Sequence, residues 1–444
     1  MIRILQNRDY ARLFAAQVVA LLGTGLLTVA LGLLAYDLAG AAAGAVLGTA
    51  YAIKMLAYVG LAPVAAALAE KLPRKGLLIG ADVIRAMVAL MLPFIDALWQ
   101  VYALIFVLQA ASATFTPAFQ AVIPEILTDE GDYTRALSLS RLAYDLENLI
   151  SPALAGLLLS VMSYHWLFGG TVLGFVGSAL LVAVVMFPPR GGAVQRSFAA
   201  RLTRGVRIYL ATPRLRGLLA LNMAAAAAAA FVLVNSVVIV RVDFGLGEGE
   251  LAGALAAFGA GSMVAALVLP RMLERLHDRW VMMVAGAALA GMSVLAGLVV
   301  MVAGWPGWAG FLALWAVIGL LYAAILTPSG RLLRRSAHAG DRPAVFAAQF
   351  ALSHACWLLT YPLAGWLGQA AGMGVTLFVL GLVALGGVIV ALRVWPTDEA
   401  GAVAHSHADL PRDHPHLREF GGAGGQHRHI VVIDDEHRVW PTHG

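Results

Sequence analysis

The stretch AEKLPRK, residues Ala69 to Lys75, decides the fold, because the chain carries the same pattern again as LERLHDR, residues Leu273 to Arg279. Each stretch follows one long apolar segment and precedes another. The two stretches start about 205 residues apart, and a second matching pair, PALAG at 152–156 and PLAG at 362–365, is about 210 residues apart. The spacing predicts two structurally similar halves.

The composition places the chain in a membrane. Of the 444 residues, 61% are hydrophobic and only 12% are charged, whereas a soluble domain contains roughly a quarter charged residues. A helix that spans a bilayer needs about 20 apolar residues. The pattern predicts twelve of them, at 12–36, 42–69, 76–95, 97–124, 136–162, 165–187, 215–241, 249–273, 280–303, 307–331, 343–370 and 373–393. We therefore expect an all-α membrane protein, with twelve transmembrane helices arranged as two six-helix bundles.

The longest polar gap divides these helices into six and six. We expect an N-terminal bundle at 1–187, a central loop at 188–214, a C-terminal bundle at 215–395 and a His-rich tail at 396–444. Lys and Arg are concentrated in alternate loops, whereas the opposite loops contain essentially only Arg241. The positive-inside rule then places both termini, the central loop and the tail in the cytoplasm, with the chain crossing a bacterial-type inner (plasma) membrane many times.

The segment that contains Ala69–Lys75 resembles the loop signature of the major facilitator superfamily, Gly-x-x-x-Asp-Arg-x-Gly-Arg-Lys. Ala66 and Pro73 replace the two glycines, and the third predicted helix follows with one acidic and one basic residue where the family often keeps a charge pair. The resemblance implies a secondary transporter with its substrate site between two halves. It also implies that a gating loop stabilises one side of the transport cycle, formed here by Glu70, Lys71, Arg74, Lys75, Asp82 and Arg85.

Polar side chains inside the predicted spans are candidates for the substrate and proton pathway, because a charge at the bilayer centre costs at least about 2.5–3.5 kcal/mol. On the second helix, Tyr51, Lys54 and Tyr58 share one face. On the fifth helix, one face carries an arginine, an aspartate and an asparagine, and a second face carries Tyr144, Glu147 and Ser151. The predicted pathway residues are Lys54, Gln109, Arg141, Asp145, Glu147, Asn148 and His354.

Each of these residues also has a purely structural interpretation. Arg141 and Asp145 are four residues apart and could simply neutralise each other. Lys54 could pair with an acid of the fifth helix as a structural lock, and His354 could be a core histidine with its hydrogen bonds satisfied. The transport interpretation adds that a buried carboxylate or an imidazole could exchange a proton near neutral pH.

The tail contains eight of the twelve histidines of the chain, in three His-x-His pairs and two single positions. Imidazole suits nickel, copper, zinc and cobalt. We therefore predict metal ligation by His405, His407, His414, His416, His427, His429, His437 and His443. The first part of the tail is expected to be disordered without metal, and HRHIVVIDDEHRVWP, from residue 427, is expected to form a small hairpin around Asp434 and Asp435. A tail that is merely hydrophilic is the alternative.

The tail, the acidic fifth helix and the histidine of the eleventh helix together resemble the nickel-resistance branch of the superfamily, whose members export nickel and sometimes cobalt. The resemblance implies proton-coupled antiport of a divalent metal cation, most simply Ni²⁺, out of the cytoplasm. The alternative is proton-coupled efflux of an organic compound, either a drug or a siderophore-like molecule, which Lys54 and its aromatic neighbours suit.

An enzyme is not expected, because the sequence lacks a Gly-x-Ser-x-Gly elbow, a P-loop and an intramembrane His-x-x-x-His pair. The expected partners are a small substrate, protons and the lipid bilayer. We expect no nucleic acid and no cofactor. A monomer is expected, because one chain supplies both halves of the pathway.

Overall fold

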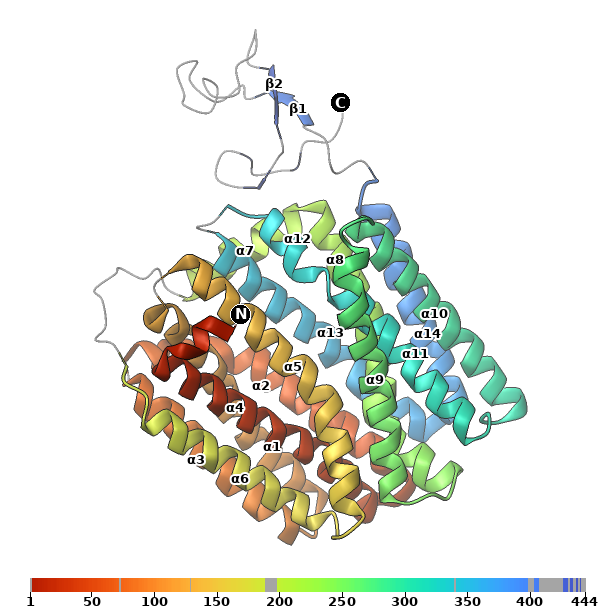
Figure 1. The fold of residues 1–444 in the computed structure, drawn as a ribbon. Coiled ribbons are helices and arrows are strands. Elements are labelled where there is room, and N and C mark those ends of the chain that lie inside the picture. The colour runs from red at the N-terminus through yellow and green to blue at the C-terminus, as the bar shows by residue number, and fades with distance from the viewer. Residues whose placement is uncertain are drawn as a thin grey trace.

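A computed structural model describes residues 2–71, 73–127, 129–187, 198–338, 341–397, 403–406, 426–429, 432–433, 437 and 440. For residues 61–71, for many positions in 116–149 and for the two short strands, only the backbone is described. Within these ranges the chain forms long helices and one small two-stranded sheet (Figure 1).

The first half contains α1 (Arg8–Ala39), α2 (Ala43–Lys71), α3 (Arg74–Met91), α4 (Leu98–Ile126), α5 (Glu130–Leu159) and α6 (His165–Ala183). The second half contains α8 (Pro213–Val238), α9 (Glu248–Met272), α10 (Asp278–Ala303), α11 (Trp308–Leu326), α13 (Arg342–Ala371) and α14 (Met373–Val394). The shorter elements are η1 (Ile2–Gln6), η2 (Gly40–Ala42), η3 (Leu92–Phe94), α7 (Phe198–Ala211), η4 (Ile239–Asp243), α12 (Ser329–Arg335), β1 (Val403–Ser406) and β2 (Gln426–His429).

The long helices confirm the predicted fold class. In the described part of the chain, 10 segments are long and apolar enough to cross a membrane, and one of them, Arg8–Gly60, contains α1 and most of α2. α5 adds a shorter apolar stretch at Ile150–Leu159. Large apolar side chains such as Leu173 and Leu267 are exposed on the outside of the bundle, as a lipid-facing surface requires.

The two halves repeat the same packing. α1 packs against α5 and α6 as α8 packs against α13 and α14, and α2 packs against α4 as α9 packs against α11. One side-chain contact repeats as well: Lys75 Nζ donates to the Val185 carbonyl at 3.2 Å, and Arg279 Nε donates to the Trp395 carbonyl at 3.0 Å. Each cation lies at the C-terminal end of the last helix of its half, where carbonyls lack helical partners. The duplicated loop pattern thus makes the same contact twice.

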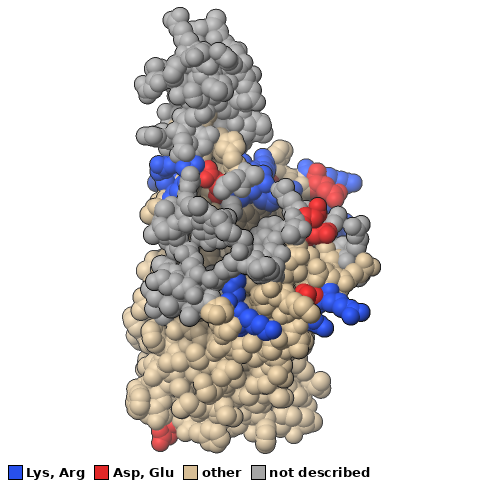
Figure 2. Space-filling model, turned by 90° about the vertical axis from the view of Figure 1, so that its left-hand side faces the viewer, with Lys and Arg blue, Asp and Glu red and all other residues tan. Residues whose placement is uncertain are grey.

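Charge is distributed unevenly between the two ends of the helices. In Figure 2, Lys and Arg gather over the upper part of the molecule and the lower part is almost entirely uncharged. The upper part is the end where α7, α12 and the tail lie in Figure 1. This end is called the basic end below, and the opposite end is called the far end.

The segment between the halves differs from the expected loop, because residues 198–211 form helix α7. α7 packs along α13, where Ile208 and Tyr209 are fully buried and Arg204 Nε donates to Asp341 Oδ1 at 2.6 Å. The tenth predicted span also differs: α11 ends at Leu326 and a separate short helix, α12, begins after Pro328. Proline lacks the amide hydrogen that would continue the first helix.

The predicted hairpin around Asp434 and Asp435 lies mostly outside the described residues. In the described part of the tail, β2 pairs antiparallel with β1, which lies more than twenty residues earlier in the chain. Beyond β2, Ile433 is fully buried in the apolar core of the bundle, and the Trp440 ring lies 5.7 Å from the Arg214 guanidinium at the start of α8. Apart from β1, the first part of the tail and the segment 434–436 lie outside the described residues.

Candidate functional site

Three ionisable residues from the two halves approach one another near the middle of the bundle. Lys54 lies on α2, Glu147 on α5 and His354 on α13. Each is 11 or 12 residues from the nearer end of its helix, which is about 16–18 Å at 1.5 Å per residue. Since the hydrocarbon core of a bilayer is about 30 Å thick, the three side chains lie near its middle. All three are partly exposed.

Lys54 connects the other two residues electrostatically. The Lys54 ammonium attracts the Glu147 carboxylate through space and also acts on the His354 ring. The ion pairs among the described side chains do not include a direct contact between Lys54 and Glu147. The two opposite charges therefore interact over a distance longer than 4 Å, within a medium that screens them less than water does.

A glycine of α1 lets Glu147 lie at this position. A Cβ atom added at Gly25 would lie 2.1 Å from Ser151 Oγ and 3.5 Å from Glu147 Cγ, so α1 and α5 can approach this closely only without that atom. The predicted face with Glu147 and Ser151 is thus packed against α1. The side chains of Arg141, Asp145 and Asn148 lie outside the described part of the structure.

Two aromatic rings pack against the imidazole of His354. Its ring centroid is 3.9 Å from that of Phe350 and 5.3 Å from that of Tyr58. His354 Nδ1 is 2.6 Å from the Phe350 carbonyl oxygen, and because a carbonyl can only accept, we assign the proton to Nδ1. Nε2 is then the ring nitrogen with a lone pair available for a proton or a ligand.

An aromatic wall extends from this site into the second half. Tyr51 of α2 lies 5.0 Å from Tyr361 of α13, measured between ring centroids, and Tyr361 lies 4.9 Å from Trp357. The wall continues to Tyr322 of α11 at 6.3 Å and to Phe258 of α9 at 5.6 Å. Such a wall offers apolar contact, stacking and a few polar edges, which is the lining typical of sites for organic ligands.

The two halves are in backbone contact on the far-end side of this site. A Cβ atom added at Gly48 of α2 would lie 2.6 Å from the Tyr361 carbonyl oxygen, and one added at Gly365 of α13 would lie 2.3 Å from the Gly44 carbonyl oxygen. Asn235 of α8 lies beside this contact: its Nδ2 donates to the Ala364 carbonyl at 3.0 Å, and a Cβ atom added at Gly44 would lie 2.7 Å from its Oδ1. No larger residue fits at these glycines without separating the helices.

Side-chain contacts between the halves reinforce this closure. Trp366 Nε1 of α13 donates to Thr49 Oγ1 of α2 at 3.0 Å. Arg241, the basic residue predicted on the far side of the membrane, has its guanidinium 5.1 Å from the centroid of the Tyr36 ring. α5 also contacts α9 in this region, through Gly156. The far end is therefore closed between the halves.

The predicted gating residues lie at several places in the first half. Asp82 and Arg85 form an ion pair within α3 that is almost completely buried, and the guanidinium lies 4.3 Å from the centroid of Phe115 and 4.5 Å from that of Phe175. Lys75 makes the helix-end contact described above, and Arg74 has a polar partner. The side chains of Glu70 and Lys71 lie outside the described part.

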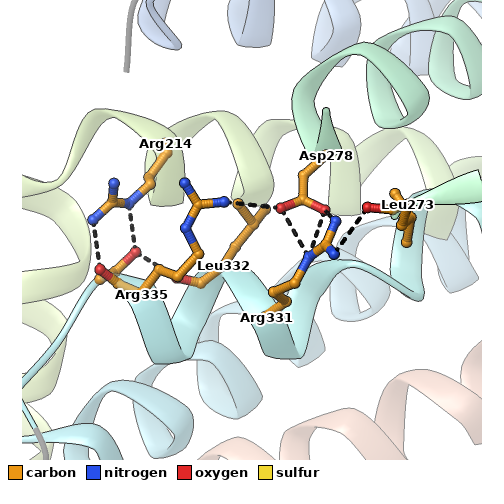
Figure 3. Close-up of polar contacts among 7 residues, drawn as sticks. Arg214, Leu273, Asp278, Arg331, Leu332 and Arg335 are labelled. Carbon is orange, nitrogen blue, oxygen red and sulfur yellow. Dashed lines mark hydrogen bonds and ion pairs between the residues drawn. The ribbon is translucent and has the colours of Figure 1, made fainter. Parts of the chain in front are cut away.

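The second half contains an ionic network that the sequence did not single out (Figure 3). Asp278, at the start of α10, pairs with Arg331 and, at 3.2 Å, with Arg335. Beside it, Arg214 donates to Ser336 Oγ at 2.7 Å and to the Arg335 carbonyl at 2.8 Å. The repeat could have drawn attention to Asp278, because this residue of LERLHDR takes the place of Arg74 in AEKLPRK.

Among the described side chains, no contact joins the other predicted residues to the central site. Gln109 is buried in α4, which packs against α2 and α3. No group of three or more His, Cys, Asp or Glu residues that could hold a metal ion occurs among the described side chains. His437 is buried, and the side chains of the other seven tail histidines lie outside the described part.

Two similar bundles with polar groups between them are the architecture of secondary transporters. The sequence matches the model of the Major Facilitator Superfamily over residues 13–294 and again over 218–429. The chain belongs to this family. It is therefore a multi-pass membrane protein of a transporter family.

Individual relatives are similar to parts of the chain. Macrolide efflux protein A of Streptococcus pyogenes is 30% identical over 188 residues, which are 41% of this chain and 46% of the relative. The uncharacterized MFS-type transporter YfiS of Bacillus subtilis (strain 168) is 28% identical over 246 residues, which are 52% of this chain and 56% of the relative. The chain thus spans about half the length of these curated relatives.

Solved structures with the same fold include two transporters. The nucleoside transporter NupG has a TM-score of 0.67 at 13% identity, with 87% of this chain and 98% of NupG covered. A bacterial homologue of the human lysosomal transporter Spinster, in an inward-facing and unoccupied conformation, has a TM-score of 0.67 at 13% identity, with 88% and 98% covered. At this identity the likeness shows the fold alone.

Proposed function

We propose that the protein exports an organic compound from the cytoplasm by alternating access, in exchange for protons. One observation carries the proposal: Lys54, Glu147 and His354 meet an aromatic wall at mid-depth between the halves, on the inner side of a closed far end. The similarity to macrolide efflux proteins supports an organic substrate and the outward direction.

The orientation follows from the distribution of charge. The basic end, with α7, α12 and the tail, is placed in the cytoplasm, because Lys and Arg are retained on that side of a bacterial inner membrane. The far end then faces outward. We therefore assign the closed far end to the state that loads substrate from the cytoplasm.

Glu147 is assigned the role of proton carrier. In the cytoplasm-facing state, a substrate that binds beside the carboxylate displaces its proton to the cytoplasm. In the outward-facing state, a proton returns to the carboxylate and weakens the hold on the substrate, which leaves. Antiport follows if the site can hold either a proton or the substrate but not both at once.

Export of Ni²⁺ remains the second prediction for the same site. Glu147 and His354 Nε2 are possible metal ligands, but the similarity to macrolide efflux proteins supports the organic substrate better. Both substrates are measured in the same experiment.

The experiment uses everted membrane vesicles energised by a proton gradient, with uptake of a labelled macrolide, of a lipophilic dye and of ⁶³Ni²⁺ followed in parallel. We expect uptake of an organic probe that a protonophore abolishes. Glu147→Gln keeps the shape of the side chain and removes its charge, and should abolish gradient-driven uptake. The matched control is Asp96→Asn, which changes an exposed carboxylate between α3 and α4 and should leave uptake unchanged.

Gradient-driven uptake of Ni²⁺ without uptake of any organic probe would overturn the proposal in favour of metal export. Full gradient-driven uptake of the macrolide by Glu147→Gln would remove the proton role assigned to Glu147.

A further inference from the structure

An apolar groove lies on the outer surface of the second half, between α10 and α11. Its volume is about 230 Å³, and all of its lining residues are apolar, among them Met292 and Val300 of α10 and Leu314 of α11. Two other lining residues, Leu295 and Val299, have exposed side chains. The groove therefore opens to the surroundings of the bundle, which in a bilayer are lipid tails.

The groove has the depth of one leaflet of a bilayer. Along α10 its lining runs from Met292 to Val300, which are 11 and 3 residues before the helix ends at Ala303. At 1.5 Å per residue, these positions are about 16 Å and about 5 Å from the far end of the helix. Half of the hydrocarbon core of a bilayer is about 15 Å thick. An acyl chain of the leaflet at the far end can therefore lie along the groove.

A tryptophan connects the groove to a carboxylate. Trp305 directly precedes Pro306, which lines the groove just beyond the end of α10. Its Nε1 donates to Oδ2 of Asp243, the last residue of η4, at 2.8 Å. The ring centroids of Phe311 and Trp315 lie 5.5 Å and 5.9 Å from the Trp305 ring and fix its position. Since tryptophan at the end of a span is typical of the headgroup level, Asp243 lies at that level beside the groove.

The Asp243 carboxylate is available to a cation. None of the ion pairs among the described side chains includes Asp243. Arg241, two residues earlier, has its guanidinium 5.1 Å from the centroid of the Tyr36 ring and donates to the Leu246 carbonyl at 3.4 Å. The bond from Trp305 is to Oδ2, so Oδ1 can accept from another donor. A charge-assisted hydrogen bond from an ammonium group suits this oxygen.

We propose that the groove is a binding site for one phospholipid with a primary ammonium headgroup, whose acyl chain lies between α10 and α11 and whose ammonium donates to Asp243. The site is separate from the transport site and does not depend on the substrate that the protein carries. The carboxylate repels an anionic headgroup, so the site distinguishes phosphatidylethanolamine from phosphatidylglycerol with the same acyl chains.

The test is native mass spectrometry of the full chain, purified in detergent and mixed with dioleoyl phosphatidylethanolamine or dioleoyl phosphatidylglycerol. We expect one molecule of the ethanolamine lipid to be retained in preference to the glycerol lipid. Asp243→Asn should reduce this preference by about tenfold, the usual effect of losing a hydrogen bond to a charged group. The matched control is Asp96→Asn, which changes an exposed carboxylate at the same far end, between α3 and α4, and should leave the preference unchanged.

A second pair of variants tests the groove itself. Ala296→Phe places a ring in the groove and should abolish retention of the lipid. Val302→Phe adds a ring to the same helix at a position that is 89% exposed, and should leave retention unchanged. Equal retention of the two lipids by the unaltered protein, or an unchanged preference in Asp243→Asn, would overturn the assignment of the headgroup to Asp243. Full retention by Ala296→Phe would show that the lipid lies elsewhere, and would overturn the proposed site.

Discussion

The backbone contact between α2 and α13 can be tested with one methyl group, by Gly48→Ala. The added Cβ would lie 2.6 Å from the Tyr361 carbonyl oxygen and 3.1 Å from the Gly365 Cα atom. Both are backbone atoms, so neither can move aside as the end of a flexible side chain could. The two helices must separate, and with them the two halves at the far end.

The size of the effect follows from known costs of overpacking, which are about 1–3 kcal/mol for an added methyl in a well-packed site. Alanine also stabilises a helix relative to glycine by up to about 1 kcal/mol, but this gain is the same whether the far end is open or closed. The closed state should therefore lose about 1–3 kcal/mol relative to the open state, which is a shift of roughly 5- to 150-fold in their ratio.

The assay measures opening of the far end directly. Ser236 of α8 is buried beside a small cavity between the halves that Thr28 and Leu47 also line. A cysteine at this position, in a chain with Cys356→Ser, should react with a membrane-impermeant thiol reagent only when the far end opens. Gly48→Ala should raise the labelling rate in intact cells by the factor given above, and should slow export.

Gly60→Ala is the matched control, because Gly60 lies on the same helix and an added Cβ there would meet no atom within 4 Å. It should change neither labelling nor export. Unchanged labelling in Gly48→Ala would refute the steric reasoning. An equal increase in Gly60→Ala would show that the effect does not come from the backbone contact at Gly48.

Two further predictions concern stability. Arg85→Ala leaves the Asp82 carboxylate buried without its partner and should destabilise the protein in detergent by about 3–5 kcal/mol, whereas combining it with Asp82→Ala should cost less than Arg85→Ala alone, as thermal unfolding of both variants would show. Ile433→Ala should free the tail and speed its removal by a protease several-fold, while Val432→Ala, at a partly exposed position, should not; equal cleavage rates would rule out docking through Ile433.

The helices were predictable because the bilayer fixes their length and glycines mark their ends. The span expected at 373–393 is α14, Met373–Val394, and Gly372 before it has a φ of 84°, a conformation that disfavours other residues. α7 was not predicted, because its apolar face is covered by α13, more than a hundred residues later. The periodicity of apolar residues shows which face of a helix is apolar, but it does not show which other helix covers that face.

The sequence predicted the residues of the central site but not their partners in the other half. Helical spacing placed Lys54 between Tyr51 and Tyr58 on one face of α2, but the sequence did not show that this face meets Tyr361 and His354 of the other half. Asp278 was missed because charged residues at the end of a span are common. Its partners Arg331 and Arg335 lie more than fifty residues away, beyond the break at Pro328 that separates α12 from α11.

The geometry also determines which part of the site changes during transport. In each half a basic side chain, Lys75 in the first and Arg279 in the second, donates a hydrogen bond to the C-terminal end of the last helix. Transporters of this architecture move their halves largely as rigid bodies. Lys54 and Glu147 belong to the same half, so their mutual attraction persists through the cycle. His354 and its side of the aromatic wall belong to the other half. We therefore expect the ring of His354 to approach and leave the Lys54–Glu147 pair as the halves rock, which changes the environment of a bound substrate without separating the two charges.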